Sequence, residues 1–247
     1  MDLQLTGKRV LITGASKGIG YACALSFVRE GASPILVARS AEGLEQAAAS
    51  IKSETGVTVE TVAMDLGAAE GAQSLAQRVG DVDILINNAG SIPGGDLTAV
   101  DDARWRAGWE LKVYGYINLT REYLPRMEAR GQGVIVNIIG MAGVANRYAY
   151  VCGSAANAAL IAFTNGVGSA SPDHGVRVFG INPSPTRTER IVHLHTPDKL
   201  EKIRAALPFG RLMEPEEVAH LAVFGCSPLC GYLSGTVINL DGGQLYR

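Results

Sequence analysis

The sequence predicts an α/β fold in which one doubly wound, seven-stranded parallel sheet carries helices on both of its faces. Three observations support this prediction. Short apolar runs that suit buried strands alternate with segments of helical periodicity along the whole chain. The 247 residues fit one large domain, 1–247. An apolar content of 47% with 30 glycines suits a buried sheet whose strands are joined through many tight turns.

The first strand, turn and helix lie in the stretch 8–20, KRVLITGASKGIG. An apolar run at 10–12 indicates a buried strand, and apolar periodicity from Ile19 to Val28 indicates a helix. The glycines between them let the backbone turn sharply and approach a pyrophosphate. The charge of that group would rest on the free N–H groups at the start of the helix. The stretch therefore predicts an anion-binding loop.

The spacing of these glycines points to a particular family. Gly14-x-x-x-Gly18-x-Gly20 is neither the G-x-G-x-x-G of the usual dinucleotide fingerprint nor a triphosphate loop. The segment 13–20, TGASKGIG, resembles the cofactor loop of the short-chain dehydrogenase/reductase family, and 87–90, NNAG, resembles its second signature. The resemblance implies a Rossmann-type domain that binds a nicotinamide dinucleotide and interconverts a carbonyl and an alcohol on a small organic substrate.

The remaining elements follow in chain order. We expect strands at 34–38, 57–63, 82–86, 133–139, 176–181 and 236–241, and helices at 41–54, 101–130, 147–170 and 215–224. Pro125 predicts a kink or a break within the long helical region. The region 187–213 lacks strand character, and the resemblance implies that it forms a lid over the substrate.

The end of the second strand indicates which nicotinamide dinucleotide is bound. In dinucleotide folds this strand end faces the adenosine ribose, where an acidic residue suits a free 2′-hydroxyl and an arginine suits a 2′-phosphate. Arg39, followed by Ser40 and helped by Lys17, therefore predicts NADP(H) in preference to NAD(H). A solvated surface arginine is the alternative. Asp65, followed by Leu66, matches the family position that meets the adenine amino group, and it would also serve as a helix N-cap.

Most of the residues expected to contact the cofactor lie at strand ends or in the turns after them, while Ile19 and Gly20 begin the first predicted helix and Asn157 lies on a later one. The expected contact residues are Gly14, Ser16, Lys17, Gly18, Ile19, Gly20, Arg39, Ser40, Asp65, Leu66, Asn88, Ala89, Gly90, Asn157, Pro183, Thr186 and Thr188. The resemblance implies that Asn88 ties neighbouring strands together. It also places the segment 182–188, NPSPTRT, beside the nicotinamide, with Ser184 where glycine is usual.

The family's four catalytic positions carry other residues in this sequence. Gly153 stands where the tyrosine is expected, Asn157 at the lysine, Gly140 at the serine and Lys112 at the asparagine. Relative to the family pattern, the lysine and the asparagine have thus exchanged positions between the two helices. From the neighbouring helix, the Lys112 ammonium would still supply the positive charge that lowers the pKa of a proton donor. Asn157 would still bind the ribose.

Tyr150 is the expected proton donor. It lies three residues before Gly153, so both would share one helix face with Ser154 and Asn157, and the glycine would leave room for the phenol ring. A packing or interface tyrosine is the alternative. The catalytic candidates are therefore Lys112, Tyr150 and Asn157. If none of them acts, the chain is a catalytically inactive nicotinamide-nucleotide-binding protein with a regulatory or assembly role.

The charged residues of the region 187–213 permit two interpretations. Basic side chains, among them Lys199 and Lys202, would suit a lid that binds an anion. Because Asp198 and Glu201 are interspersed with them, an ordinary solvated helix face is equally compatible.

Composition excludes several other classes of function. With 22 basic and 24 acidic residues and no basic run, neither nucleic acid nor a membrane surface is an expected partner. No leader is visible and no apolar run approaches the ~20 residues that cross a bilayer, so we expect a cytoplasmic location. His193 and His195 lack further ligands at metal spacing, and no metal site is expected. The resemblance implies a homotetramer or homodimer built on the helices of 101–130 and 147–170.

Overall fold

The computed structural model of the chain describes residues 1–68, 70–194 and 196–246 and omits the side chains of residues 190, 193 and 194. His195 and the side chain of His193, which were considered as metal ligands, therefore lie outside the described residues.

A seven-stranded parallel sheet forms the centre of the molecule. Its strands are β1 (Arg9–Thr13), β2 (Ser33–Ala38), β3 (Glu60–Ala63), β4 (Ile84–Asn87), β5 (Gly133–Ile138), β6 (Val176–Pro183) and β7 (Val237–Leu240). They lie in the order β3-β2-β1-β4-β5-β6-β7, and each neighbouring pair is parallel. From β1 the strands are added outward to β3 on one side and then, starting with β4, outward to β7 on the other side. The switch point between β1 and β4 is where open α/β sheets bind their ligands. The predicted fold class is confirmed.

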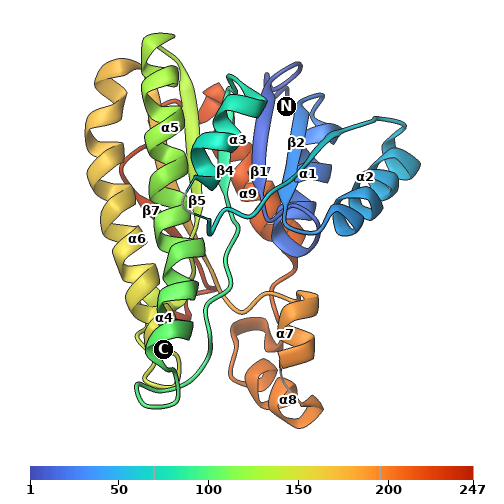
Figure 1. Cartoon of the computed structure of the whole chain (residues 1–247). Coiled ribbons are helices and arrows are strands. Elements are labelled where there is room, and N and C mark those ends of the chain that lie inside the picture. Colours follow the sequence, from blue (N-terminus) through green and yellow to red (C-terminus); the bar gives the residue numbers. More distant parts are fainter. Residues whose placement is uncertain (69, 195, 247) are drawn as a thin grey trace.

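Helices cover both faces of the sheet (Figure 1). The described helices are α1 (Gly18–Arg29), α2 (Ala41–Thr55), α3 (Gly71–Val79), α4 (Asp102–Trp109), α5 (Gly115–Ala129), α6 (Val151–Ala170), α7 (Glu189–Leu194), α8 (Pro197–Ala205) and α9 (Pro215–Cys226), of which α7 and α8 do not lie against the sheet. Within β1, Val10 and Ile12 pack on the side of α1, α2 and α9, whereas Leu11 packs on the side of α3 and α5. This alternation follows from the two-residue period of a strand. None of the described helices is both long and apolar enough to cross a bilayer.

The long helical region is interrupted at a different place from the one predicted. A π-helical turn, Glu110–Tyr114, separates α4 from α5, whereas α5 continues through Pro125. Pro125 and Arg121, whose carbonyl loses its amide partner, are both exposed, so water can satisfy that carbonyl. A break at the proline is therefore contradicted, and nothing in the sequence had indicated the π turn.

The helix predicted from residue 147 begins at Val151 instead. Tyr150 immediately precedes it with an extended φ of −145°, because it forms a parallel bridge with Gly95. This pairing of distant segments overrides the local helical pattern. The third strand is also shorter than expected and begins at Glu60, where its pairing with Ile35 starts.

Candidate cofactor and active site

The turn between β1 and α1 is shaped as an anion-binding loop. Gly14 and Gly18 have φ values of 66° and 57°, a region that favours glycine. A Cβ atom on Gly20 would lie 2.4 Å from the carbonyl oxygen of Gly14, so the close return of the chain also requires glycine. Lys17 precedes α1 without capping it through its side chain. No capping side chain therefore takes the N–H groups of the first turn, which is the condition that a pyrophosphate site at a helix N-terminus requires.

Asn88 joins this loop to the end of β4, as the resemblance implied. Its Nδ2 atom donates to the carbonyl oxygens of Thr13, at 2.9 Å, and Gly14, at 3.3 Å. The Thr13 hydroxyl accepts from the backbone N–H groups of Asn88 and Ala89 at 2.9 and 3.0 Å. A Cβ on Gly14 would lie 3.0 Å from the Asn88 Nδ2 atom and from the Ala89 Cα atom. The two signatures thus lie against each other as one surface of small residues, which would let a dinucleotide approach the backbone closely.

The end of β2 offers an open cation. Arg39 and Ser40 are exposed, and the Ser40 hydroxyl caps α2 by accepting from the N–H of Gly43 at 3.0 Å. Ser16 lies next to this cap, 3.4 Å from where a Cβ on Gly43 would stand. Within the described part of the chain, the Arg39 guanidinium has no hydrogen bond or ion pair. Its charge is thus available to a phosphate beside Ser40.

The neighbouring residues are placed as follows. The Asp65 carboxylate accepts from the N–H of Gly67 at 3.0 Å in a tight turn. It does not cap α3, which begins at Gly71, because the chain first passes through a further turn. Leu66 is buried, and Ile19 packs against the core on the α1 side.

The Lys17 ammonium, which was expected at the 2′-phosphate, pairs in this structure with Glu189 of α7. The Nζ to Oε2 distance is 3.0 Å, and the two side chains are 64% and 63% exposed. An exposed pair of this kind contributes little stability, about 0–1 kcal/mol, so an incoming phosphate can replace the carboxylate at low cost.

Lys112 lies in the π turn and reaches the space between β4 and β5. Its stem passes over Gly90, where a Cβ would stand 3.0 Å from the Lys112 Cδ atom. Its Nζ atom donates to the carbonyl oxygen of Ile139, just beyond β5, at 2.7 Å. The half-buried ammonium therefore lies at the carboxyl edge of the sheet, beside the second signature. π turns are frequent at functional sites because the extra residue re-aims the side chains of the turn.

Asn157 approaches the same backbone segment from α6. Its Nδ2 atom lies 3.1 Å from where a Cβ on Gly140 would stand, and Gly140 itself has a φ of 138° that favours glycine. The side chain is buried, and its Oδ1 atom has no hydrogen-bond partner among the described residues. Lys112 and Asn157 thus converge on residues 139–140, as the predicted exchange of the two residues requires.

The Tyr150 ring lies directly over Gly153. A Cβ there would be 2.1 Å from the ring atoms Cε1 and Cζ and 2.6 Å from the hydroxyl oxygen. The prediction that this glycine makes room for the ring is confirmed, but the shared helix face is not, because Tyr150 precedes α6. Ser154 turns away, and its hydroxyl accepts from the N–H of Arg147 at 3.2 Å. Tyr150 also packs against an apolar cluster that includes Ile92, so it has a structural role too.

The segment after β6 crosses the phosphate loop. Pro183 ends β6, and the buried hydroxyl of Thr186 donates to the carbonyl of Ser184 at 2.8 Å. The Thr188 methyl group would be 3.1 Å from a Cβ on Gly18. The residues proposed to flank the nicotinamide and those proposed to bind the pyrophosphate therefore form one surface.

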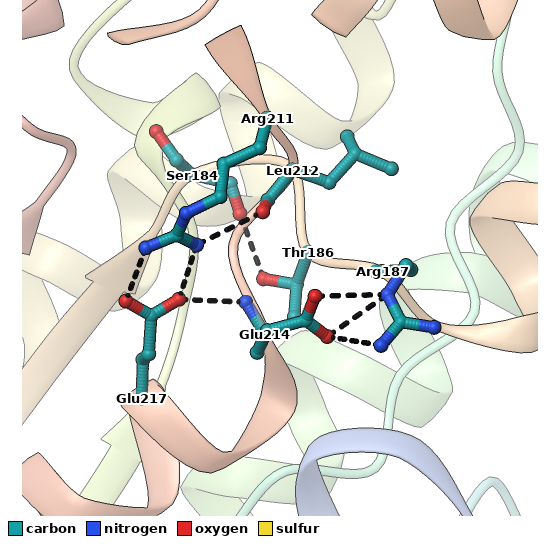
Figure 2. Close-up of polar contacts among 7 residues, drawn as sticks. All are labelled: Ser184, Thr186, Arg187, Arg211, Leu212, Glu214 and Glu217. Carbon is teal, nitrogen blue, oxygen red and sulfur yellow. Dashed lines mark hydrogen bonds and ion pairs between the residues drawn. The ribbon is translucent and has the colours of Figure 1, made fainter. Parts of the chain in front are cut away.

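The predicted lid, region 187–213, is fastened at both ends to the start of α9 (Figure 2). At its start, Arg187 pairs with Glu214 at 2.7 Å, and at its end Arg211 pairs with Glu217 at 2.7 Å. Glu217 also accepts from the N–H of Glu214 at 2.8 Å, and these contacts lower the pKa of Glu217 to about 2. Between its fastened ends, the region forms α7 and α8, which stand apart from the two helical layers (Figure 1). Sequence reasoning had not found this double clamp.

Tyr116 is a further residue that the sequence had not singled out. Its hydroxyl donates to the carbonyl oxygen of Ile138 at 2.8 Å, next to the carbonyl that receives Lys112. Burial raises the pKa of Tyr116, so it remains a protonated donor that fixes the end of β5. The sequence offered only one indication of this role, namely that Tyr116 lies one helical turn beyond Lys112.

No group of three or more potential metal ligands occurs in the ranges that the structure describes.

Comparison with known proteins finds relatives over nearly the whole chain. Residues 8–198 match the family model of the short chain dehydrogenases. The chain is 32% identical to galactitol 2-dehydrogenase (L-tagatose-forming) from Cereibacter sphaeroides, over 97% of this chain and 96% of the relative. The structure of L-sorbose reductase from Gluconobacter frateurii with NADPH and L-sorbose has a TM-score of 0.91 at 33% identity, covering 100% of both chains. That of 7α-hydroxysteroid dehydrogenase with NADH and 7-oxo glycochenodeoxycholic acid has a TM-score of 0.91 at 29% identity, covering 98% of this chain and 96% of that one.

Proposed function

The chain belongs to the short chain dehydrogenase family, and we propose that it is an NADP(H)-dependent oxidoreductase with a non-standard active site. It would interconvert a carbonyl and an alcohol on a small organic substrate. The observation that carries this proposal is the convergence of Lys112 and Asn157 on the segment 139–140. A cation and an amide thus meet at the carboxyl edge of the sheet, next to the surface that fits a dinucleotide.

Each candidate residue has a defined task in this proposal. The bound nicotinamide supplies the hydride chemistry. Lys112 places a positive charge beside the reacting oxygen and lowers the pKa of a nearby hydroxyl donor. Tyr150 donates its phenolic proton to the alkoxide oxygen in the direction of reduction and takes the proton back in oxidation. The buried Oδ1 atom of Asn157, which has no partner in the described residues, suits a ribose hydroxyl as its donor.

The preference for NADP(H) rests on the end of β2. L-sorbose reductase was solved with NADPH and the steroid dehydrogenase with NADH, so family membership alone does not decide between the two dinucleotides. Arg39 has an exposed guanidinium without a partner among the described residues, and Lys17 lies on the adjoining loop. Two cations suit a 2′-phosphate better than a free 2′-hydroxyl.

Turnover measurements test the catalytic assignment. Purified protein is assayed for NADPH and NADH oxidation with a panel of ketones and aldehydes. We expect Lys112→Met and Tyr150→Phe each to lower kcat by at least about 100-fold, because the proton transfer loses its support. Lys52→Met, on the exposed side of α2, is the matched control and should leave kcat unchanged. Wild-type turnover in both site variants would remove the assigned roles.

A catalytically inactive nucleotide-binding protein is the second candidate. The packing of Tyr150 in an apolar cluster favours it, because a tyrosine placed there for stability needs no catalytic role. This candidate predicts that calorimetry detects NADP binding while the protein transfers no hydride to any substrate. Substrate-dependent NADPH consumption by the pure protein would exclude it.

Three further expectations belong to the proposal. The region 187–213 would act as the substrate lid, since its ends are fastened while α7 and α8 stand apart. A homodimer or homotetramer would form through the helices α4 to α6, which light scattering on the purified chain can test. A cytoplasmic location stays a prediction of the sequence.

A further inference from the structure

A cavity of about 310 Å³ lies beneath the lid helix α8. Its polar lining consists of Arg147, Lys199, Lys202 and Gln244, and no acidic residue is among its described lining residues. Arg147 comes from the turn before α6, and Gln244 from the C-terminal segment. With Pro185 from the segment after β6 and the residues of and just after α8, the cavity is walled by four separate parts of the chain, and its charged groups all carry the same sign.

The three cations of this cavity are not neutralised by the described part of the protein. The side chains of Arg147, Lys199 and Lys202 have no ion pair or hydrogen bond there. Other lid cations behave differently: Arg204 pairs with Glu201 at 2.8 Å, just as Arg187 and Arg211 pair with the carboxylates of α9. All three residues are exposed, so water screens part of their mutual repulsion, and an anion that binds between them relieves the rest.

The charges of α8 are sorted by face. Lys199, Lys202, Ile203 and Ala206 line the cavity, and their spacing of i, i+3, i+4 and i+7 places them on one stripe of the helix. Glu201 lies on another face, where its carboxylate forms an ion pair with Arg204. Asp198 lies four residues before Lys202 at the edge of the stripe without forming an ion pair with it. An ordinary solvated face would mix both signs, so this sorting favours the anion-binding interpretation of the lid.

Two residues that line the cavity lie close in sequence to residues of the proposed reaction centre. Pro185, which lines it, follows directly on the segment 183–184 proposed to flank the nicotinamide. Arg147 lies three residues before Tyr150, and its backbone N–H is held by Ser154 of α6. A ligand whose carbonyl reaches Tyr150 can therefore extend into the cavity, and about 300 Å³ is the lower end of the range that small-molecule sites occupy.

We propose that the substrate is an anionic carbonyl or alcohol compound whose carboxylate or phosphate group binds Arg147, Lys199 and Lys202; this inference rests on the proposed oxidoreductase function. Arginine offers the paired donors that planar anions accept, and lysine adds compact positive charge. The apolar Ile203 gives the carbon chain of the substrate a surface to contact.

Matched pairs of acids and esters test this proposal. Oxo acids of three to eight carbons and their methyl esters are compared as substrates of the full-length protein with NADPH. We expect the best acid to exceed its ester by at least about tenfold in kcat/KM, mainly through KM, as a charge-assisted contact would give. Lys199→Ala, Lys202→Ala and Arg147→Ala should each reduce that preference, and the double lysine variant should abolish it. Arg204→Ala removes the same charge from another face of α8 and should leave the preference intact.

The outcomes separate this inference from the proposed function. If esters are reduced as well as acids, the anion proposal fails while the oxidoreductase assignment stands. If nothing is reduced, 2-oxoglutarate and inorganic phosphate are titrated by calorimetry into NADP-saturated protein. Binding that weakens about tenfold in the double lysine variant but not in Arg204→Ala would uphold the anion site and refute the oxidoreductase function. Absence of binding by both probes would overturn the anion site as well.

Discussion

Replacing Gly153 with alanine is expected to have opposite effects on stability in two backgrounds. In the wild type the new Cβ would lie 2.1 Å from two atoms of the Tyr150 ring, so the ring must move. Overpacking of this kind costs about 1–3 kcal/mol. The better helix propensity of alanine returns about 0.5–1 kcal/mol. We therefore expect a net loss of about 1 kcal/mol in the free energy of unfolding.

In a Tyr150→Ala background the obstacle is gone and only the gain in helix propensity remains. Gly153→Ala should then stabilise the protein by about 0.5–1 kcal/mol. The difference between the two backgrounds, about 1–3 kcal/mol, is the coupling energy that a double-mutant cycle reports. Gly166→Ala is the control in the same helix, because a Cβ there meets nothing within 4 Å. It should stabilise both backgrounds alike.

Urea denaturation of the four proteins of this cycle, followed by circular dichroism, measures these values. If Gly153→Ala stabilises both backgrounds equally, the ring does not occupy the space above the glycine, and the account of Tyr150 given above is wrong. The single variant should also lower NADPH turnover by a factor similar to that of Tyr150→Phe, because the phenol would be pushed from its place.

Two further predictions concern cofactor choice and pH. Arg39→Asp should lower kcat/KM with NADPH by about 10- to 100-fold and raise it with NADH, because a charge-assisted contact to the 2′-phosphate is lost; kinetics with both cofactors measure this. Glu217→Gln should cost about 1 kcal/mol of stability at pH 7, a value kept small by the 41% exposure of the carboxylate. Since the native pKa is lowered from 4.5 to about 2, this stabilisation is complete above pH 5 and is lost as the pH falls toward 2. Equal stability loss at pH 7 and pH 2 would contradict this account of Glu217.

The first strand, loop and helix could be predicted from the sequence because much of what shapes the loop is local. Gly20 approaches the carbonyl of Gly14 within the same turn, so the spacing of these two glycines reflects the geometry of the loop. The start of α6 could not be read in this way. It depends on the bridge between Tyr150 and Gly95, which are distant in sequence, and no local pattern records that pairing.

Part of the candidate site could be predicted from the sequence, namely which helix carries the lysine and which carries the asparagine. The sequence placed Lys112 and Asn157 on two helices, but their meeting at residues 139–140 depends on the π turn, for which the sequence has no known signal. Lys199 and Lys202 were visible as charges from the outset. Their function could not be decided, because helical periodicity shows which residues share a face but not what lies against that face.

The double clamp at the start of α9 has a consequence for how the region 187–213 of this chain can be varied. The bridge between Thr186 and Met213 and the two arginine pairs beside it hold the two ends of the region 187–213 together at a fixed place. Because these two ends are held, a change in the number of residues between them alters the entropy cost of closing the loop only slowly. We therefore expect that α8 can be replaced by a helix of different charge and shape while the sheet stays as it is, whereas α7 is tied to the nucleotide loop through the pair of Glu189 with Lys17. If the region is the substrate lid proposed above, a segment from a relative joined at these two anchor points should change the substrate preference.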